Sequence, residues 1–202
     1  MAGQDSPHAP RAPFRVGFVT GATPDKWARA WRERRRDRLE LVPVTEGEQE
    51  AMLRSGEIDM CLVRLPVDRD GLHLIPLYEE QPVVVMGREH LLTLLEEVRL
   101  EDLDEEQLVL PERSGWTPSV EQLSWPPMSE KDAIETVAAG TGVAIVPMSV
   151  ARLFHRKDVT HRPVADLEPT WVGLAWLVAR DDERTQAFVG VVRGRTANSS
   201  RA

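Results

Sequence analysis

The chain has 202 residues, of which 42% are hydrophobic and 29% are charged, a composition typical of folded globular proteins and unlike that of disordered chains. Its formal net charge of −8 repels phosphate backbones, so we expect no direct binding of nucleic acid. The single cysteine, Cys61, excludes an intrachain disulfide, no apolar run is long enough to span a membrane, and the N-terminus lacks the apolar core of a secretory signal, so we expect a cytoplasmic protein.

The first third of the chain alternates apolar runs with helical patterns. We expect strands at 14–19, 39–44, 58–65 and 72–77, and helices from Pro24 into the charged stretch 32–38 and from 46 to 55. The turn after the first strand has a glycine, a threonine that can cap a helix and a proline at the expected first helical position. A strand–helix–strand–helix–strand order predicts a parallel sheet.

A second block of elements begins at residue 81. We expect strands at 81–86, 108–111, 143–146, 160–164 and 171–176, and helices at 100–106, 129–140, 149–154 and 182–193. Ser129 and Asp132 have the spacing of a helix-capping pair. In "ETVAAGTGVAIVPMSVAR" (135–152) a helical pattern turns through two glycines into a short apolar strand, which Pro147 ends.

Four segments, in this order, resemble the effector-binding domain of LysR-type transcriptional regulators: "FRVGFVTG", "EQEAMLRSGEIDMCLVRLP", "LIPLYEEQPVVVMGREHLL" and "AIETVAAGTGVAIVPMSVARL". The segments "HRKDVTHRPV" and "VGLAW" resemble an actinobacterial form of the family. No single segment is a strict signature, but the ordered series is fairly specific and covers about residues 14–195. Only about 13 residues precede the first expected strand, where the family has a helix-turn-helix, so we expect a sensor domain without the DNA-binding part.

The resemblance implies an α/β fold of the type 2 periplasmic-binding-protein kind, with two Rossmann-like subdomains joined by two crossover segments. Subdomain I would comprise 14–79 and 165–195, and subdomain II would comprise 80–164, between a disordered lead (1–13) and a disordered tail (196–202). It implies that a small metabolite binds in the cleft between the subdomains without a cofactor. A partner, such as a full-length regulator, would then carry the response to transcription.

We expect the ligand contacts of subdomain I in the loops after the first three strands, because ligands bind beyond the carboxyl ends of parallel strands. The expected contacts are Thr20, Gly21, Ala22, Thr23, Thr45, Glu46, Arg64 and Leu65. Arg64 can hold a carboxylate through two hydrogen bonds, or it can form an internal ion pair with Glu46. Glu46 stands where the family more often has a neutral hydroxyl residue, and it favours a cationic or hydrogen-bond-donating ligand.

Subdomain II would contribute Ser114, Met128 and Ser129 to the same cleft. Met128 offers an adaptable apolar contact. The alternative is that these residues form only a loop and a helix cap.

The resemblance also implies a homodimer, in which the first helix of one copy contacts subdomain II of the other. The residues expected at this interface are Trp27, Trp31, Arg34, Ala133 and Leu153. Two tryptophans on a charged helix are costly to leave in water, but the alternative is that both indoles fill the core of the monomer.

The sequence contains no recognisable catalytic set. We find no G-x-S-x-G, Walker loop, H-E-x-x-H or two-cysteine motif, and His155 and His161 lack further ligands at metal spacing. We therefore expect a binding protein that is not an enzyme and holds no metal. Two alternatives stay open, an enzyme on the same two-lobed fold and a dimerisation subunit for full-length regulators.

Overall fold

The computed structural model describes residues 12–194, which form two compact units. Unit 1 comprises the described residues up to Ile75 and those from Gly173 onward, and unit 2 comprises Pro76–Val172. The chain passes from unit 1 to unit 2 within strand β4 (Leu72–Glu80) and returns within strand β8 (Thr170–Leu177). Most of the expected disordered lead and all of the expected tail lie outside the described residues. Between residues 12 and 194, no helix has the length and apolar composition needed to cross a membrane.

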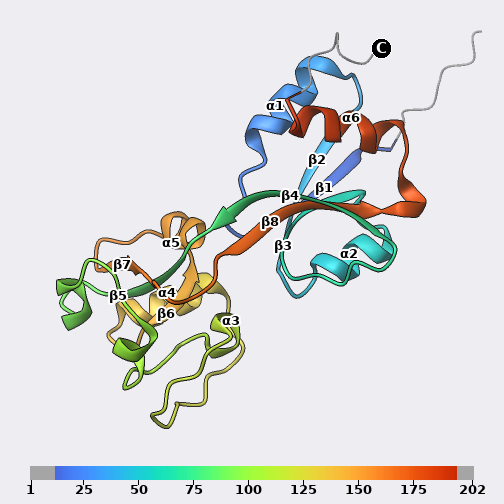
Figure 1. Cartoon of the computed structure of the whole chain (residues 1–202). Coiled ribbons are helices and arrows are strands. Elements are labelled where there is room, and N and C mark those ends of the chain that lie inside the picture. Colours follow the sequence, from blue (N-terminus) through green and yellow to red (C-terminus); the bar gives the residue numbers. More distant parts are fainter. Residues whose placement is uncertain (1–11, 195–202) are drawn as a thin grey trace, which may run out of the picture. The chain divides into compact units, whose positions relative to one another are not determined.

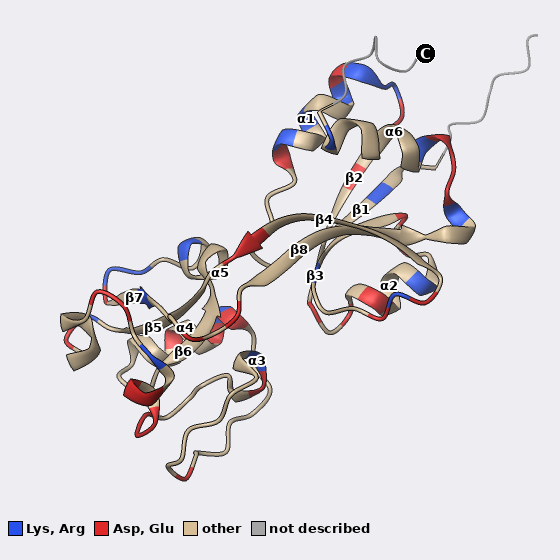
Figure 2. Ribbon diagram, in the orientation of Figure 1, with Lys and Arg blue, Asp and Glu red and all other residues tan. Residues whose placement is uncertain are grey.

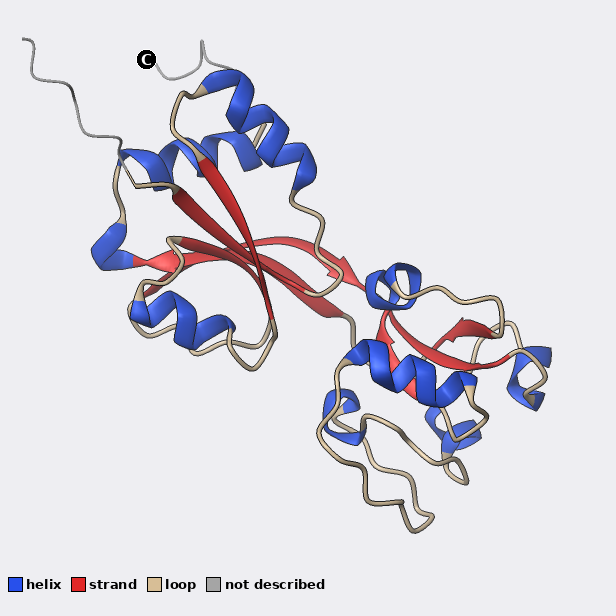
Figure 3. Ribbon diagram, turned by 180° about the vertical axis from the view of Figure 1, so that it is seen from behind, coloured by secondary structure: helices blue, strands red, loops and turns tan. Residues whose placement is uncertain are grey.

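Unit 1 is built on a five-stranded sheet with the strand order β2-β1-β3-β8-β4. Strand β1 (Phe14–Val19) runs parallel to both of its neighbours, β2 (Leu39–Val44) and β3 (Met60–Arg64), which confirms the predicted parallel sheet. Helices α1 (Asp25–Arg34) and α6 (Glu183–Val192) cover one face, and helix α2 (Gln49–Ser55) covers the other (Figures 1 and 3). The short helix η3 (Val178–Arg180) follows β8.

Three aromatic rings hold α1 and α6 on the sheet. The ring of Trp31 stacks on that of Phe14 with centroids 5.1 Å apart, and Phe188 of α6 lies 5.8 Å from Trp31 and 6.0 Å from Phe14. The indole Nε1 of Trp31 donates to the carbonyl of Asp37 at 2.9 Å, so its one polar atom is satisfied inside the unit. Trp31 is therefore a core residue.

The structure buries three of the five residues expected at the dimer interface. Trp31 and Ala133 have no exposed surface and Trp27 is only 7% exposed, so these three side chains pack inside their own units. The spacing of the two tryptophans fits either face of a helix, and burying the indoles in the core removes the cost that suggested a partner. Arg34 and Leu153 are exposed, and they keep the predicted role as a proposal.

Unit 2 is built on a three-stranded antiparallel sheet in which β5 (Pro82–Gly87) lies between β6 (Ala144–Pro147) and β7 (Val159–Pro163). Side chains alternate along β5, so Val83 and Val85 enter one apolar cluster while Val84 and Met86 enter another. Both faces of this strand are thus buried, as its continuous apolar sequence requires.

Different elements cover the two faces of this sheet. Helices α4 (Glu130–Ala138) and α5 (Met148–Leu153) pack on the face of Val83, and the 3₁₀ helices η1 (Leu91–Leu94) and η2 (Leu100–Leu103) pack on the face of Val84 (Figures 1 and 3). The strand expected at 108–111 is only an isolated bridge between Leu108 and Val143, because Pro111 begins the short helix α3 (Pro111–Ser114).

The glycine turn between α4 and β6 depends on close backbone contact. Gly142 has a φ of 73°, and a Cβ at this position would lie 2.2 Å from the carbonyl oxygen of Gln107. The next residue, Val143, donates its N–H to that same carbonyl at 2.8 Å. Only glycine permits both the left-handed backbone and this approach, and strand β6 follows directly and ends at Pro147.

Candidate functional site

The carboxyl ends of β1, β2 and β3 lie at one edge of the unit 1 sheet, because the three strands are parallel and adjacent. Arg64, the last residue of β3, connects the three ends through its guanidinium. Its Nη1 lies 2.5 Å from Oε1 of Glu46 after β2, and its Nη2 donates to the carbonyl of Thr20 after β1 at 3.2 Å. The structure thus brings together three of the predicted ligand residues.

Arg64 is a buried charge with a built-in counter-ion. Its side chain is 4% exposed, and that of Glu46 is 22% exposed. A buried guanidinium is tolerated only when it is paired and hydrogen-bonded, and the Glu46 carboxylate supplies the charge. The ion pair that the sequence left open as one alternative is therefore present, and Glu46 faces the solvent side of that pair.

Gln49, which the sequence analysis did not single out, fixes the backbone of Arg64. From the first turn of α2, its Nε2 donates to the carbonyl of Arg64 at 3.0 Å, and its Oε1 accepts from the N–H of Arg64 at 2.9 Å. Gln49 is 4% exposed. The sequence shows only an amide residue near the start of an expected helix, and the partner of that amide lies fifteen residues away, beyond any local pattern.

The loops around Arg64 contain the other predicted contacts of unit 1. Thr45 donates its hydroxyl to Oε2 of Glu48 at 2.6 Å, so it serves the turn into α2. Gly21 has a φ of 88°, which turns the chain after β1, and Ala22 is buried while Thr23 is exposed. Thr23 does not cap α1, because the capping residue is Pro24 and no side-chain cap bond forms. Leu65 is half-buried.

The predicted contacts in unit 2 all have structural roles there. The hydroxyl of Ser114 lies 3.0 Å from the carbonyl of Pro111 and 2.7 Å from that of Trp116, within the turn that ends α3. Ser129 caps α4 in a reciprocal capping box with Asp132, as the spacing predicted. Met128 packs against the apolar cluster on the face of Val83. Their predicted role in ligand binding stays a prediction.

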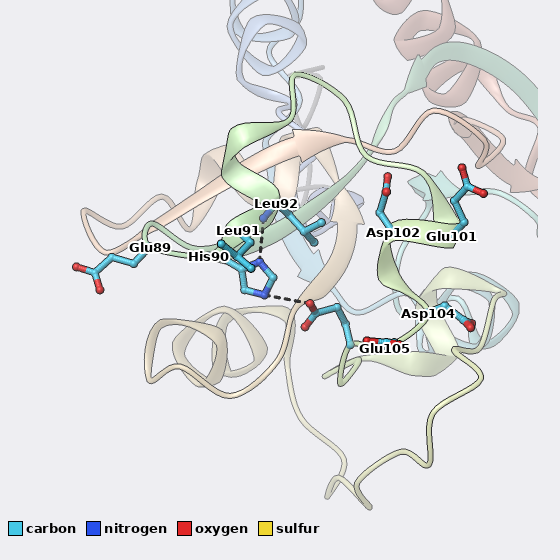
Figure 4. Close-up of a pocket in the computed structure, with 9 residues that line it drawn as sticks. Glu89, His90, Leu91, Leu92, Glu101, Asp102, Asp104 and Glu105 are labelled. Carbon is cyan, nitrogen blue, oxygen red and sulfur yellow. Dashed lines mark hydrogen bonds and ion pairs between the residues drawn. The ribbon is translucent and has the colours of Figure 1, made fainter.

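Unit 2 also contains a hollow of about 660 Å³ between η1 and η2 (Figure 4). We call it the acidic hollow because carboxylates dominate its lining, which comprises Glu89, His90, Leu91, Leu92, Glu101, Asp102, Asp104, Glu105 and Glu106. His90 lies on its wall, with Nε2 3.3 Å from Oε1 of Glu106. Within the described part of the chain, no group of three or more His, Cys, Asp or Glu residues is arranged to hold a metal ion.

The remaining candidates for catalysis have unsuitable surroundings. Cys61 is fully buried in β3, and burial raises the pKa of its thiol to about 12, so it is not a nucleophile at neutral pH. Burial, with the nearby charges of Arg152 and Arg162, lowers the pKa of His161 below its ordinary value. The lowered pKa leaves this imidazole neutral at neutral pH, beside two arginines.

The chain is similar in sequence to one protein family and to two bacterial regulators. The family model described as "LysR substrate binding domain" matches residues 8–197. The HTH-type transcriptional regulator AlsR of Bacillus subtilis is 27% identical over 81% of this chain and 59% of its own length. The Hca operon transcriptional activator HcaR of Escherichia coli is 28% identical over 91% of this chain and 68% of its own length. This chain therefore spans about three-fifths of AlsR.

Solved structures show the same fold. The crystal structure of the effector binding domain of a BenM variant superposes with a TM-score of 0.76, covering 91% of this chain and 94% of that one, at 20% sequence identity. This likeness confirms the predicted type 2 periplasmic-binding-protein-like fold. The expected actinobacterial character stays a prediction.

The clamp that Gln49 forms on Arg64 can be tested by replacing the amide with an apolar side chain of similar length. We expect Gln49→Met to lower the free energy of unfolding by about 1–3 kcal/mol, because it removes two hydrogen bonds to buried groups. Urea denaturation should show this loss, and the exposed Gln81→Met, between β4 and β5, should stay within about 0.5 kcal/mol of the wild type. Equal stability of the two variants would contradict the clamp.

Proposed function

Since this chain belongs to the LysR substrate-binding-domain family, we propose that it is a sensor that binds a small-molecule effector in the control of transcription. The names of its relatives, a transcriptional regulator and a transcriptional activator, support this role. The effector-binding domain in the BenM structure, which has the same fold, also supports it. A sensor needs a binding site and no chemistry, in keeping with the raised pKa of Cys61. We place its action in the cytoplasm.

The observation that carries this proposal is the position of Arg64. Its guanidinium lies where three parallel strands end, and ligands of open α/β sheets bind beyond these ends. We propose that the effector contacts this edge through Arg64, Glu46 and the Thr20–Thr23 loop. The further expectation, that unit 2 contributes Ser114, Met128 and Ser129 to the same ligand, stays a prediction.

Glu46 defines the charge of the effector that we propose. The ion pair already neutralises Arg64, so a bare carboxylate ligand would have to displace or repel the Glu46 carboxylate. A ligand that donates a hydrogen bond or carries a positive charge gains an acceptor there instead. We therefore infer an effector with a donor group, such as an amine, amide or hydroxyl, directed at Glu46.

The output of this sensor passes through a partner in our proposal. A formal charge of −8 opposes contact with the DNA backbone, so this chain by itself would not provide the DNA-binding surface. Binding can affect a partner only if the effector has different affinities for two states of the protein. A full-length regulator of the same family is the partner that we propose.

The proposed site is tested by removing each charge of the ion pair in turn. For a compound that raises the melting temperature of the wild type in a metabolite screen, Glu46→Gln should weaken binding about 10- to 150-fold, the loss of one charge-assisted hydrogen bond. Arg64→Met should weaken the binding of the same compound, because Glu46 then loses the guanidinium that positions its carboxylate. Titration calorimetry gives both affinities, and Thr93→Val in unit 2 is a control that should bind normally. Tighter binding by Glu46→Gln would overturn the inferred charge of the effector, and unchanged affinity in both variants would overturn the site.

We also propose a homodimer that uses Arg34 and Leu153, the two expected interface residues that are exposed. Leu153, at the end of α5, leaves 58% of its surface in water. Sedimentation at tens of micromolar should show a wild-type dimer, and Leu153→Glu should weaken it at least about ten-fold by placing a charge in an apolar contact. Leu123→Glu, at a residue that is 53% exposed, is the matched control and should stay dimeric. A monomeric wild type would refute this assembly.

A further inference from the structure

Two leucines of unit 2 are unusually exposed. Leu91 and Leu94 leave 79% and 83% of their surfaces in water, more than any other large apolar residue in the described part of the chain. Both belong to the 3₁₀ helix η1, in which residues three apart lie above one another on the same face. They therefore form a leucine ridge, the name used here for Leu91 and Leu94 together.

The backbone that carries the leucine ridge is held in place. Arg162 of β7 donates from Nε to the carbonyl of Leu95 and from Nη2 to the carbonyl of Thr93, both at 2.7 Å. At the other end of η1, Nδ1 of His90 accepts from the N–H of Leu92 at 3.3 Å. Leu92 itself is buried in the cluster on the face of Val84. A surface fixed in this way loses little conformational entropy when it binds a partner.

The acidic hollow lies directly beside the leucine ridge, and Leu91 is part of its wall (Figure 4). Figure 2 shows the acidic residues gathered along the segment that contains η2. Hydrogen bonds from Ser119 lower the pKa of Asp104, which keeps this carboxylate ionised at neutral pH. The surface therefore combines exposed apolar side chains with a concentration of negative charge.

A second copy of this chain does not fit this surface. Ridge against ridge would bring the carboxylates of the two hollows together, which is unfavourable. The arginine-rich helix α1 has the opposite charge, but its apolar residues Trp27, Ala28 and Trp31 are buried and cannot cover the leucines. The occupant must supply both large apolar side chains and positive charge.

We propose that the leucine ridge and the acidic hollow form a docking surface for a cationic amphipathic helix of a partner protein. The apolar side chains of such a helix would cover Leu91 and Leu94, and its Lys or Arg side chains would meet the carboxylates of Glu101 and Glu105. This surface lies within unit 2 and does not involve Arg64, so it is independent of the proposed effector site.

The test uses a fluorescent synthetic helix of about 18 residues, roughly five turns, with leucines along one face and lysines elsewhere. Fluorescence anisotropy with the full chain at about 0.15 M salt should show binding, and a peptide of the same composition in scrambled order should bind at least about ten-fold more weakly. Leu91→Ser/Leu94→Ser should lose about ten-fold or more in affinity, whereas the matched control Val120→Ser/Leu123→Ser should bind like the wild type.

A second variant tests the charges without touching the leucines. Glu101→Gln/Glu105→Gln should weaken the binding of the lysine peptide and make that binding less dependent on salt. The proposal is overturned if the wild type does not bind the peptide, or if Leu91→Ser/Leu94→Ser binds it as tightly as the wild type, since charge alone would then explain the contact. It is also overturned if sedimentation shows that this leucine variant dissociates a wild-type oligomer, because the occupant would then be a second copy.

Discussion

The edge of the unit 1 sheet depends on the contacts that the guanidinium of Arg64 makes. The guanidinium connects the ends of three parallel strands, through Glu46 after β2 and the carbonyl of Thr20 after β1. Gln49 fixes its backbone from α2, so a helix on one face of the sheet positions a charge at the sheet edge. Removing water from a guanidinium costs several kcal/mol, and the ion pair with Glu46 helps to offset this cost. The same pairing holds the loops in which we place the effector.

Much of this fold could be predicted because it depends on patterns among residues that are close in the sequence. The βαβαβ order, the capping pair Ser129 and Asp132 and the glycine turn before β6 each depend on neighbouring residues. The orientation of Trp31 could not be predicted, because helical spacing does not say which face meets the sheet. Its burial depends on Phe14 and Phe188, which are distant in sequence.

The candidate site shows the same division between local and distant information. Strand ends identified Arg64, Glu46 and Thr20 as neighbours, since the rule for parallel sheets requires only the strand order. The role of Gln49 could not be predicted, because its side chain binds a backbone group on a different element. Conversely, the exposed leucines of η1 and the acidic run through η2 were visible in the sequence, but only the fold places them side by side (Figure 4).

The central claim is that this chain holds a small molecule at the edge formed around Arg64, without changing it chemically. The most direct measurement is native mass spectrometry of the protein purified from its own host, compared with Arg64→Met purified in the same way. We predict a bound metabolite that is released intact from the wild type and is absent from the variant. A wild type that carries no small molecule, or a ligand that the Arg64→Met protein retains in equal amount, would contradict the claim.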